Sequence, residues 1–183
     1  MTDILKITAA DIDADGFYIG QADVTDYPGH IEIAAGLGWV RFKARLSAKF
    51  SITAKAGTGI KAGLGIKAGA GIEAGWGIEA GWGIKAGSGI KAGGGIEAGG
   101  GIEAGWGIEA GLGIKAGGGI EAGDGIEAGF SISAKWVSSR LRIFAGLCLW
   151  RLPRPEEAQI HAELRSGTIA FGELVEPEKE AAA

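Results

Sequence analysis

The sequence predicts an all-β protein built as a β-solenoid, or β-helix, of hexapeptide repeats. Isoleucine recurs at every sixth position from Ile60 to Ile132, glycine supplies 36 of the 183 residues, and apolar and polar residues alternate from about residue 40 to 136. Two glycines in every six residues disfavour a helix, whereas alternation is the period of a strand with one buried face. A single strand of this length would span roughly 300 Å at ~3.3 Å per residue, so the chain must coil into stacked short strands.

Each repeat unit contains isoleucine, a glutamate or lysine, alanine, glycine, a variable residue and a second glycine. The isoleucine, alanine and variable residue share one parity, which predicts that they point inward. We therefore expect Trp76, Trp82, Trp106 and Trp136 to lie in the core; the alternative is that they form an exposed binding platform. The glycines are expected at corners, because glycine adopts positive φ at little cost.

The charges suggest how many hexads make one coil, because opposite charges are favourable on neighbouring strands. From Lys61, in steps of six, the charged residues read K K E E K K E E E K E E. At a spacing of 12, eight of ten pairs are opposite, against five of nine at a spacing of 18. At a spacing of 12, large variable residues also alternate with small ones. The sequence thus favours two hexads per coil, with a three-sided coil of three hexads as the alternative.

Four segments follow from these patterns. Residues 1–39 form an N-terminal cap, residues 40–136 the hexapeptide-repeat solenoid, residues 137–176 capping strands with a hairpin, and residues 177–183 a flexible tail. The buried parity changes near Trp39 and again after Trp136, which indicates a bulge or corner at each place. The hairpin is expected to turn at Ser166 and Gly167, and a short helix from Pro155 is the competing interpretation.

Composition narrows the functional classes. The net charge of −4 does not favour nucleic-acid binding by bulk charge, so nucleic acid is the less favoured partner and another protein or a second copy the favoured one. The single cysteine, Cys148, excludes an internal disulfide framework and fits a reducing compartment. The first residues lack the features of a secretory signal, and no run of ~18 apolar residues occurs. We expect a cytoplasmic protein that does not bind a membrane.

Few residues offer chemistry. The stretch DIDADG, from Asp11 to Gly16, has the first six positions of a calcium loop, but the twelfth position is Ala22, so an acidic turn is expected. The hexad period resembles that of left-handed β-helix acyltransferases, which use a histidine base. The two histidines, His30 and His161, lie outside the repeat. We expect no catalytic residue, no cofactor, no metal and no small-molecule substrate.

Charge is segregated along the repeat. Between residues 41 and 67 there are seven basic residues and no acid, which predicts a basic stripe on one sheet face. Six acids lie between residues 97 and 127. These residues are the candidates for partner binding: Arg41, Lys43, Arg45, Lys49, Lys55, Lys61, Lys67, Glu97, Glu103, Glu109, Glu121, Asp124 and Glu127.

The run GI[E/K]AGxGI[E/K]AGx, preceded by IEIAAGLGWVRFKARLSAKFSITAKAGTG, resembles uncharacterised hexapeptide-repeat proteins of bacterial genomes and prophages. The resemblance covers roughly residues 31–150. It implies a repeat fold and a mobile-element origin, with no assigned activity. The first functional hypothesis is a non-enzymatic scaffold or protein-binding module, whose partner is another protein or a second copy. The second is a phage-type inhibitor that blocks a nucleic-acid-binding or defence complex through its charged faces. The third is a hexapeptide-repeat acyltransferase.

Overall fold

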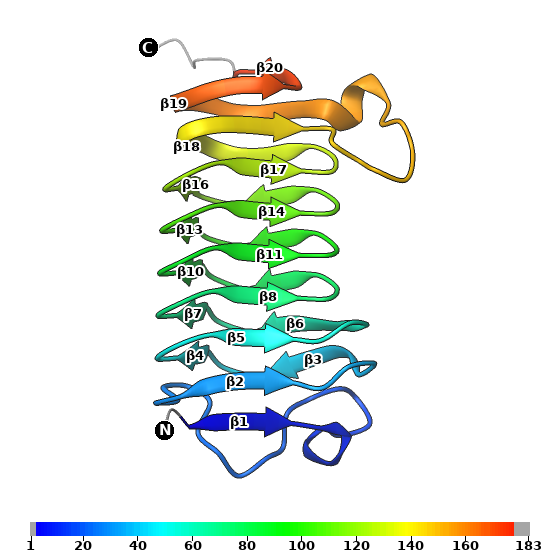
Figure 1. Cartoon of the computed structure of the whole chain (residues 1–183), viewed down its shortest axis with the longest axis vertical. Helices are drawn as coiled ribbons and strands as arrows, with labels where there is room; N and C mark the ends of the chain where they lie inside the picture. The colour runs from blue at the N-terminus through cyan, green and yellow to red at the C-terminus, as the bar shows by residue number, and fades with distance from the viewer. Residues whose placement is uncertain (1–2, 178–183) are drawn as a thin grey trace, which may run out of the picture.

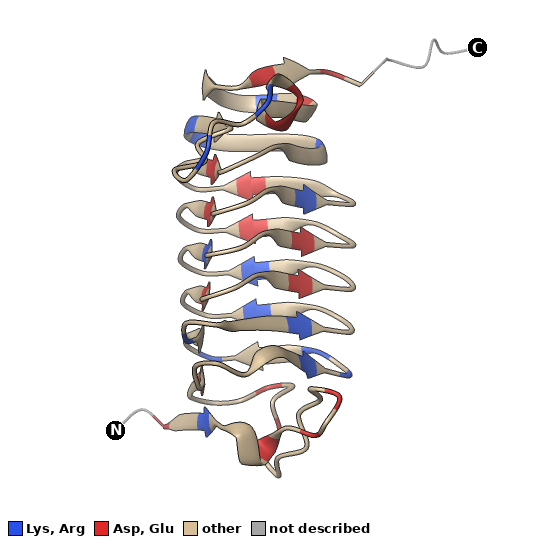
Figure 2. Cartoon of the chain, turned by 90° about the vertical axis from the view of Figure 1, so that its right-hand side faces the viewer, with Lys and Arg blue, Asp and Glu red and all other residues tan. Residues whose placement is uncertain are grey.

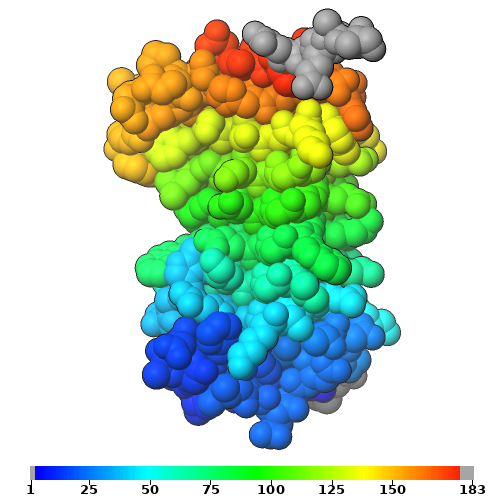
Figure 3. Space-filling model, turned by 180° about the vertical axis from the view of Figure 1, so that it is seen from behind, coloured from blue at the N-terminus to red at the C-terminus, as the bar shows by residue number. Residues whose placement is uncertain are grey.

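A computed structural model describes residues 3–177 and confirms the β-solenoid. Parallel strands stack in about eight coils with almost no helix (Figure 1). The chain climbs from β1 at one end to β20 at the other, and its sequence order follows the long axis of the molecule (Figure 3). Each coil therefore contacts only the coils before and after it, as is typical of solenoids.

One coil of the repeat contains three hexads. Ile84 lies beside Ile66 on one side and Ile102 on the other, so ladder neighbours are separated by three hexads of sequence. The two-hexad coil that the charges favour is therefore wrong, and the three-sided alternative is confirmed. Hexads separated by two repeats lie on different faces, so the opposite charges counted at that spacing are not neighbours.

The strands define three faces. The first face contains β3 (Gly38–Phe42), β6 (Thr58–Ala62), β9 (Ile78–Ala80), β12 (Ile96–Ala98) and β15 (Ile114–Ala116). The second contains β4 (Leu46–Ala48), β7 (Ile66–Ala68), β10 (Ile84–Ala86), β13 (Ile102–Ala104) and β16 (Gly119–Ala122). The third contains β1 (Ile4–Ile7), β2 (His30–Ile33), β5 (Ile52–Ala54), β8 (Ile72–Ala74), β11 (Ile90–Ala92), β14 (Ile108–Ala110) and β17 (Ile126–Ala128).

Three corners join the faces. Corner 1–2 joins the first and second faces, corner 2–3 the second and third, and corner 3–1 the third and first. In the repeat, corner 1–2 comprises residues 63–65, 81–83, 99–101 and 117–119. Corner 2–3 comprises residues 69–71, 87–89, 105–107 and 123–125, and corner 3–1 comprises residues 75–77, 93–95, 111–113 and 129–131.

The interior is a column of isoleucine and alanine. Every isoleucine and alanine of the repeat strands β7 to β17 is buried, whereas the glutamate or lysine between them points to solvent. Stacking places isoleucine on isoleucine and alanine on alanine along each face, as in Ile96 between Ile78 and Ile114. The alternation predicted from sequence therefore holds within each short repeat strand.

The repeat glycines serve close approach between coils rather than positive φ. Within residues 3–177 the positive-φ glycines all lie outside the regular hexads from Ile60 to Ile132, at positions 16, 36, 38, 57, 146, 167 and 172. In the repeat, a Cβ on Gly99 would lie 2.1 Å from the carbonyl oxygen of Gly81 in the coil below, and a Cβ on Gly81 would lie 2.1 Å from that of Gly63. The expectation that the repeat glycines supply positive φ is wrong.

The N-terminal coils are wider than those of the repeat. Val40 pairs with Ile60, a separation two residues longer than three hexads, because additional residues lengthen the turn before β6. In this turn the buried Thr58 hydroxyl donates to the Ala34 carbonyl at 2.8 Å and accepts from the Leu37 amide at 3.1 Å. The predicted parity change lies at the corner between β2 and β3, where Gly36 and Gly38 have positive φ. A 3-10 helix, η1 (Ala9–Asp11), follows β1.

The C-terminal strands continue the coil. β18 (Ile132–Ala145) runs across all three faces and pairs in turn with β15, β16 and β17. β19 (Gln159–Phe171) lies parallel to β18, and β20 (Glu173–Val175) lies parallel to the start of β19. The hairpin expected around Gly167 is therefore wrong, because the chain bends there without reversing. The competing helix is a short 3-10 turn, η2 (Pro155–Ala158). From residue 178 onward, the predicted tail lies outside the residues that the structure describes.

Candidate binding surfaces

The basic candidate residues surround the N-terminal coils instead of lining one face. Arg41 and Lys61 are ladder neighbours on the first face, and Lys67 lies on the second. Lys43 and Arg45 lie in the turn from the first to the second face, Lys49 in the turn from the second to the third, and Lys55 in the turn from the third to the first. The single-face stripe expected from parity is therefore wrong, because each face uses only every third hexad.

The acidic candidate residues surround the C-terminal half of the repeat. Glu97 lies on the first face, Glu103 and Glu121 are neighbours on the second, and Glu109 and Glu127 are neighbours on the third. Asp124 lies at corner 2–3 beside Arg140, at 3.6 Å. Within the repeat, Figure 2 shows mainly blue strands in the lower coils and mainly red strands in the upper coils, with one blue strand among the latter.

Ion pairs link some neighbouring coils. Lysine–glutamate pairs between ladder neighbours join Lys61 to Glu79, Lys85 to Glu103, Lys91 to Glu109 and Lys115 to Glu97, with N–O distances from 2.5 to 3.3 Å. The hydrogen bond from Lys91 to Glu109 raises the pKa of the Lys91 ammonium. Exposed pairs of this kind contribute about 0.2–1 kcal/mol each, so they adjust the stability of the stack without determining its geometry.

The variable residue of each hexad points outward at a corner. Trp76, Trp82 and Trp106 are 48%, 67% and 62% exposed, and they lie at corners 3–1, 1–2 and 2–3 respectively. Their expected place in the core is wrong, because the chain turns at each corner and the strand parity does not carry across it. Trp136 is half-buried, with its indole lying over Gly119 on the second face.

Gly94→Trp tests this placement. A Cβ at Gly94 would meet the Gly77 amide nitrogen at 3.1 Å, and the corner beyond it is exposed. We expect a loss of stability of about 1 kcal/mol, measured by urea denaturation, because only a small adjustment at the surface is needed. In a two-hexad coil the same residue would face inward, and overpacking would cost about 3 kcal/mol. A loss of that size would contradict the outward corner.

Shallow grooves run along the faces beside the stripes of repeat glycines. One groove, of about 1150 Å³, follows the third face past Gly71, Gly89 and Gly107, with Trp106 and Leu141 on its side. Smaller grooves of about 440 and 510 Å³ follow the second and first faces. In the first-face groove the indole of Trp39 lies against Gly59 and Gly77 of the same chain. A glycine stripe can therefore accept a flat apolar group.

The segment between β18 and β19 leaves the solenoid as a loop at the C-terminal end of the third face (Figure 1). Leu149 and Leu152 in this loop are 100% and 92% exposed. Trp150 packs edge-on against Phe130, with ring centroids 5.8 Å apart, and the Arg151 guanidinium lies 4.4 Å from the Phe130 centroid. The backbone is thus anchored to the last repeat while its leucines face solvent.

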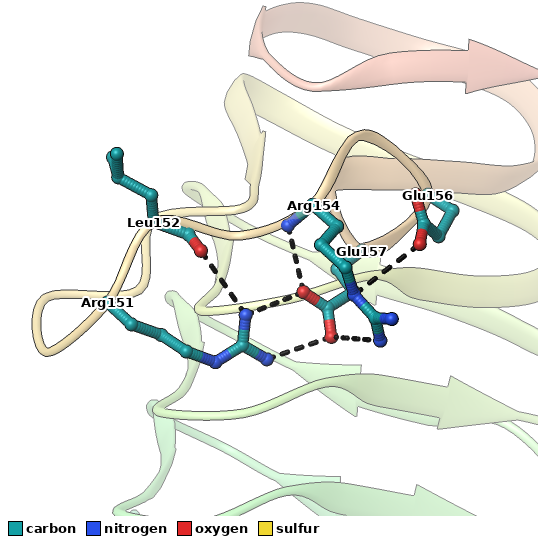
Figure 4. Close-up of polar contacts among 5 residues, drawn as sticks. All are labelled: Arg151, Leu152, Arg154, Glu156 and Glu157. Carbon is teal, nitrogen blue, oxygen red and sulfur yellow. Dashed lines mark hydrogen bonds and ion pairs between the residues drawn. The ribbon is translucent and has the colours of Figure 1, made fainter.

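One carboxylate holds the base of the loop. Glu157 accepts two hydrogen bonds from Arg151, at 2.7 and 2.8 Å, and two more from the backbone amide and guanidinium of Arg154 (Figure 4). The paired Arg151 contact is the bidentate geometry that favours carboxylate recognition. These contacts, above all those from Arg151, hold the pKa of Glu157 far below its ordinary value of 4.5.

The contacts of Glu157 predict a specific pH response. A carboxyl whose pKa is lowered by folding stabilises the native loop at pH values above its unfolded pKa, and this contribution is lost as the pH falls toward the folded value. We expect the amide protection factors of residues 147–152, which are corrected for the intrinsic pH dependence of exchange, to be constant from pH 7 to the ordinary Glu157 pKa and to fall steadily below it. Glu157→Gln should accelerate exchange at neutral pH and flatten this acid response. The control is Glu163→Gln, which removes an exposed ion pair with Arg165 at 3.8 Å. It should change neither the exchange at neutral pH nor the acid response.

The remaining candidate residues have structural contacts. Asp11 accepts from the Thr8 amide and hydroxyl, and Asp13 accepts from the Asp15 and Phe17 amides, so the DIDADG segment forms turns. Among residues 3–177 no cluster of three or more potential metal ligands occurs. His30 lies 2.7 Å from the Ser51 hydroxyl.

The two histidines considered for acyltransferase chemistry, His30 and His161, lie at separate ends of the solenoid. The His30 ring stacks on Phe50 at a centroid distance of 5.0 Å, and no carboxylate within residues 3–177 hydrogen-bonds to it. His161 is exposed at the opposite end of the molecule, on β19. No observation on these two residues favours transferase chemistry.

The exposed leucine loop and the face grooves are surfaces that sequence reasoning missed. The only available signal for the loop was the apolar run LCLW followed by RLPRP, which interrupts the alternation. Within the described part of the chain, no helix is long and apolar enough to cross a membrane. Comparison of the chain with protein-family models, curated proteins and solved structures gave no match.

Proposed function

We propose that this protein is a non-enzymatic binding scaffold whose solenoid presents the leucine loop, residues 147–153, to a partner protein. The observation that carries the proposal is the near-complete exposure of Leu149 and Leu152 in a loop fixed at both sides. Exposed apolar groups held in one conformation lower the entropy cost of binding. Clustered exposed apolar side chains are typical of protein interaction sites.

A solenoid suits this role because its ladder of backbone hydrogen bonds makes a rigid rod. The loop lies at one end of that rod, beside the acidic coils and the third-face groove. A partner that covers the two leucines therefore also contacts the acidic side chains of the neighbouring coils and the third-face groove. Apolar anchors surrounded by a polar rim are the usual arrangement of a specific interface.

A phage-displayed library of random peptides provides the test. Selection on the immobilised wild-type protein should enrich peptides, most of which bind at least about tenfold more weakly to a Leu149→Ser/Leu152→Ser variant, the loss expected for two buried apolar anchors. Ile4→Ser/Ile19→Ser is the matched control, because these residues are exposed at the N-terminal end, away from the loop and the third-face groove beside it. If no enriched peptide depends on the loop, or if both variants lose binding equally, the proposal is wrong.

A second candidate function rests on the acidic coils. Glu121 and Glu127 stand out from two faces of one coil, next to Glu103 and Glu109 of the coil before it, so acidic charge covers the second and third faces at this end of the repeat. A rod of regularly spaced carboxylates can imitate nucleic-acid phosphates and block a host nuclease or defence complex, in keeping with a prophage origin. The same rod carries basic coils at its other end, which offer a second contact to such a complex.

This candidate requires an identified target. Wild-type protein on beads should capture a DNA-binding or nuclease complex from a bacterial lysate at low salt and release it at high salt. The purified complex should then lose DNA binding when wild-type protein is added, and Glu103→Lys/Glu109→Lys should lose this effect. Failure of the purified complex to respond would remove the candidate, whatever the beads had captured.

A further inference from the structure

On the second face, the outward charges follow a self-complementary order along the rod. When the order is reversed, each positive charge comes to lie where a negative charge was. From the N-terminal to the C-terminal coil the exposed charges read Lys67, Lys85, Glu103 and Glu121, whereas Ser47, the ladder neighbour of Lys67 toward the N-terminus, is buried. Reading the four charges backward exchanges each lysine with a glutamate. The midpoint lies between Lys85 and Glu103, near the middle of the chain.

Within one chain this column is poorly compensated. Lys67 is the ladder neighbour of Lys85, and Glu103 is the ladder neighbour of Glu121, so two like-charge contacts occur on one face. Neighbouring like charges on a sheet are unfavourable. Lys85 pairs with Glu103 at 2.5 Å, but among residues 3–177 neither Lys67 nor Glu121 has an ion-pair partner. Lys67 and Glu121 are both exposed and available to charges from another molecule.

The adjoining corner has the same kind of pattern in side-chain size. The variable residues of corner 1–2 are Leu64, Trp82, Gly100 and Gly118, so bulk is confined to the N-terminal half. Trp82 and Leu64 are exposed large apolar side chains, whereas Gly100 and Gly118 leave space above their coils. Reversal of this column places each large residue opposite a glycine.

We propose that the second face is the interface of an antiparallel, two-fold symmetric dimer of this chain. The two-fold axis runs along the strand direction and passes between the coils of Lys85 and Glu103. Rotation about it brings Lys67 opposite Glu121 of the second copy, and Trp82 opposite Gly100. Each contact occurs twice, as an isologous interface requires. The interface goes beyond the proposed loop function, because it uses a different surface and a defined partner.

The first and third faces do not have this property about their midpoints. The first-face column is Arg41, Lys61, Glu79, Glu97, Lys115 and Ser133. Over the same coils the third-face column, which follows Lys6 and Glu32, is Thr53, Glu73, Lys91, Glu109, Glu127 and Phe144. Reversal places Glu79 against Glu97 on the first face and Glu73 against Glu127 on the third. If the two-fold axis is moved from the midpoint of the first face toward Lys61, opposite charges of the two copies do meet. At that level, however, Trp39 already fills the groove.

The size of the face predicts a weak dimer. Five coils at ~4.8 Å, with a width of about six residues at ~3.3 Å, give roughly 500 Å² per copy. The total for two copies, roughly 1000 Å², lies at the lower end for specific complexes. The contacts that carry the pattern are exposed charges, which salt screens. Dimerisation should therefore depend on protein concentration and weaken as ionic strength rises.

Sedimentation equilibrium of the full chain and its charge variants tests the dimer. Lys67→Glu and Glu121→Lys should each raise the dissociation constant at least about tenfold, because each creates two like-charge contacts across the interface. The double variant Lys67→Glu/Glu121→Lys restores opposite charges and should return to within about threefold of the wild type. Rescue of this kind distinguishes a direct contact from misfolding.

Two further variants locate the contact. Lys55→Glu makes the same charge change at corner 3–1, away from the second face, and should leave dimerisation unchanged. Trp82→Ala should weaken the dimer, since it removes the largest side chain of corner 1–2. The proposal is overturned by a wild type that stays monomeric into the submillimolar range, by no rescue in the double variant, by an equal effect of Lys55→Glu, or by no effect of Trp82→Ala. Because none of these variants alters the leucine loop, loop-dependent peptide binding reports separately on the proposed function.

Discussion

Replacing Gly99 by alanine is expected to destabilise the protein by about 3 kcal/mol, one of the two largest effects of a single substitution in the repeat. The new Cβ would lie 2.1 Å from the Gly81 carbonyl oxygen, and the same contact recurs between Gly81 and Gly63 below it. The oxygen belongs to backbone, so it cannot swing aside like a flexible side chain. Accommodating the methyl group therefore requires neighbouring coils to separate, with loss of the bond from the Gly99 amide to the Ala80 carbonyl.

Gly107→Ala is the matched control. Its Cβ would lie 3.5 Å from the nearest atom, the Gly125 oxygen, and neither Gly99 nor Gly107 has positive φ. Both substitutions restrict the unfolded chain equally, which favours folding by about 0.4–1 kcal/mol where the native space allows it. Urea denaturation should thus show Gly107→Ala within about 1 kcal/mol of wild type. Equal losses of stability at the two positions would show that close approach between coils does not explain the glycine that follows alanine in each hexad.

The sequence predicts the strands correctly because their pattern is local. Isoleucine and alanine two positions apart, with a charge between them, specify a short strand with one buried face, and Ile84 to Ala86 forms such a strand. The number of hexads per coil is not local. A six-residue repeat places isoleucine on isoleucine whether a coil contains two hexads or three. Two features favoured the two-hexad coil, the exposed charges and the alternation of large and small variable residues. Each charge pair contributes too little to decide, and the large variable residues Trp76, Trp82 and Trp106 lie on the surface.

Sequence patterns did not place the tryptophans or the leucine loop correctly. Parity placed Trp82 inside because it assumed one continuous strand, yet the chain turns between Ala80 and Ile84 and the residue between the glycines points outward. The leucine loop has no period, so its position depends on Arg151, Glu157 and Phe130 meeting in three dimensions. Segregation of charge along the axis was predicted correctly, but its distribution over three faces depends on the coil length.

Replacing Ile96 by alanine is expected to cost about 2–5 kcal/mol, the range for truncating a fully buried isoleucine. Ile96 is buried in the middle of the stack, between Ile78 and Ile114 on the same face. The loss is expected near the upper end of that range, because the closed ladder around the core resists collapse into a cavity. Ile96→Val should cost about 0.5–1.5 kcal/mol, and Leu112→Ala, at an exposed corner, less than about 1 kcal/mol.

The damage from Ile96→Ala should also be local. In a solenoid each coil is stabilised by its own residues and by its two neighbours, so a cavity in one coil weakens the nearest interfaces most. Native-state amide exchange should therefore accelerate most in β9, β12 and β15 and least in β2 and β19, which lie several coils away. A uniform acceleration along the whole rod would instead mean that the coils unfold as a single unit, and the nearest-neighbour account of this fold would have to be abandoned.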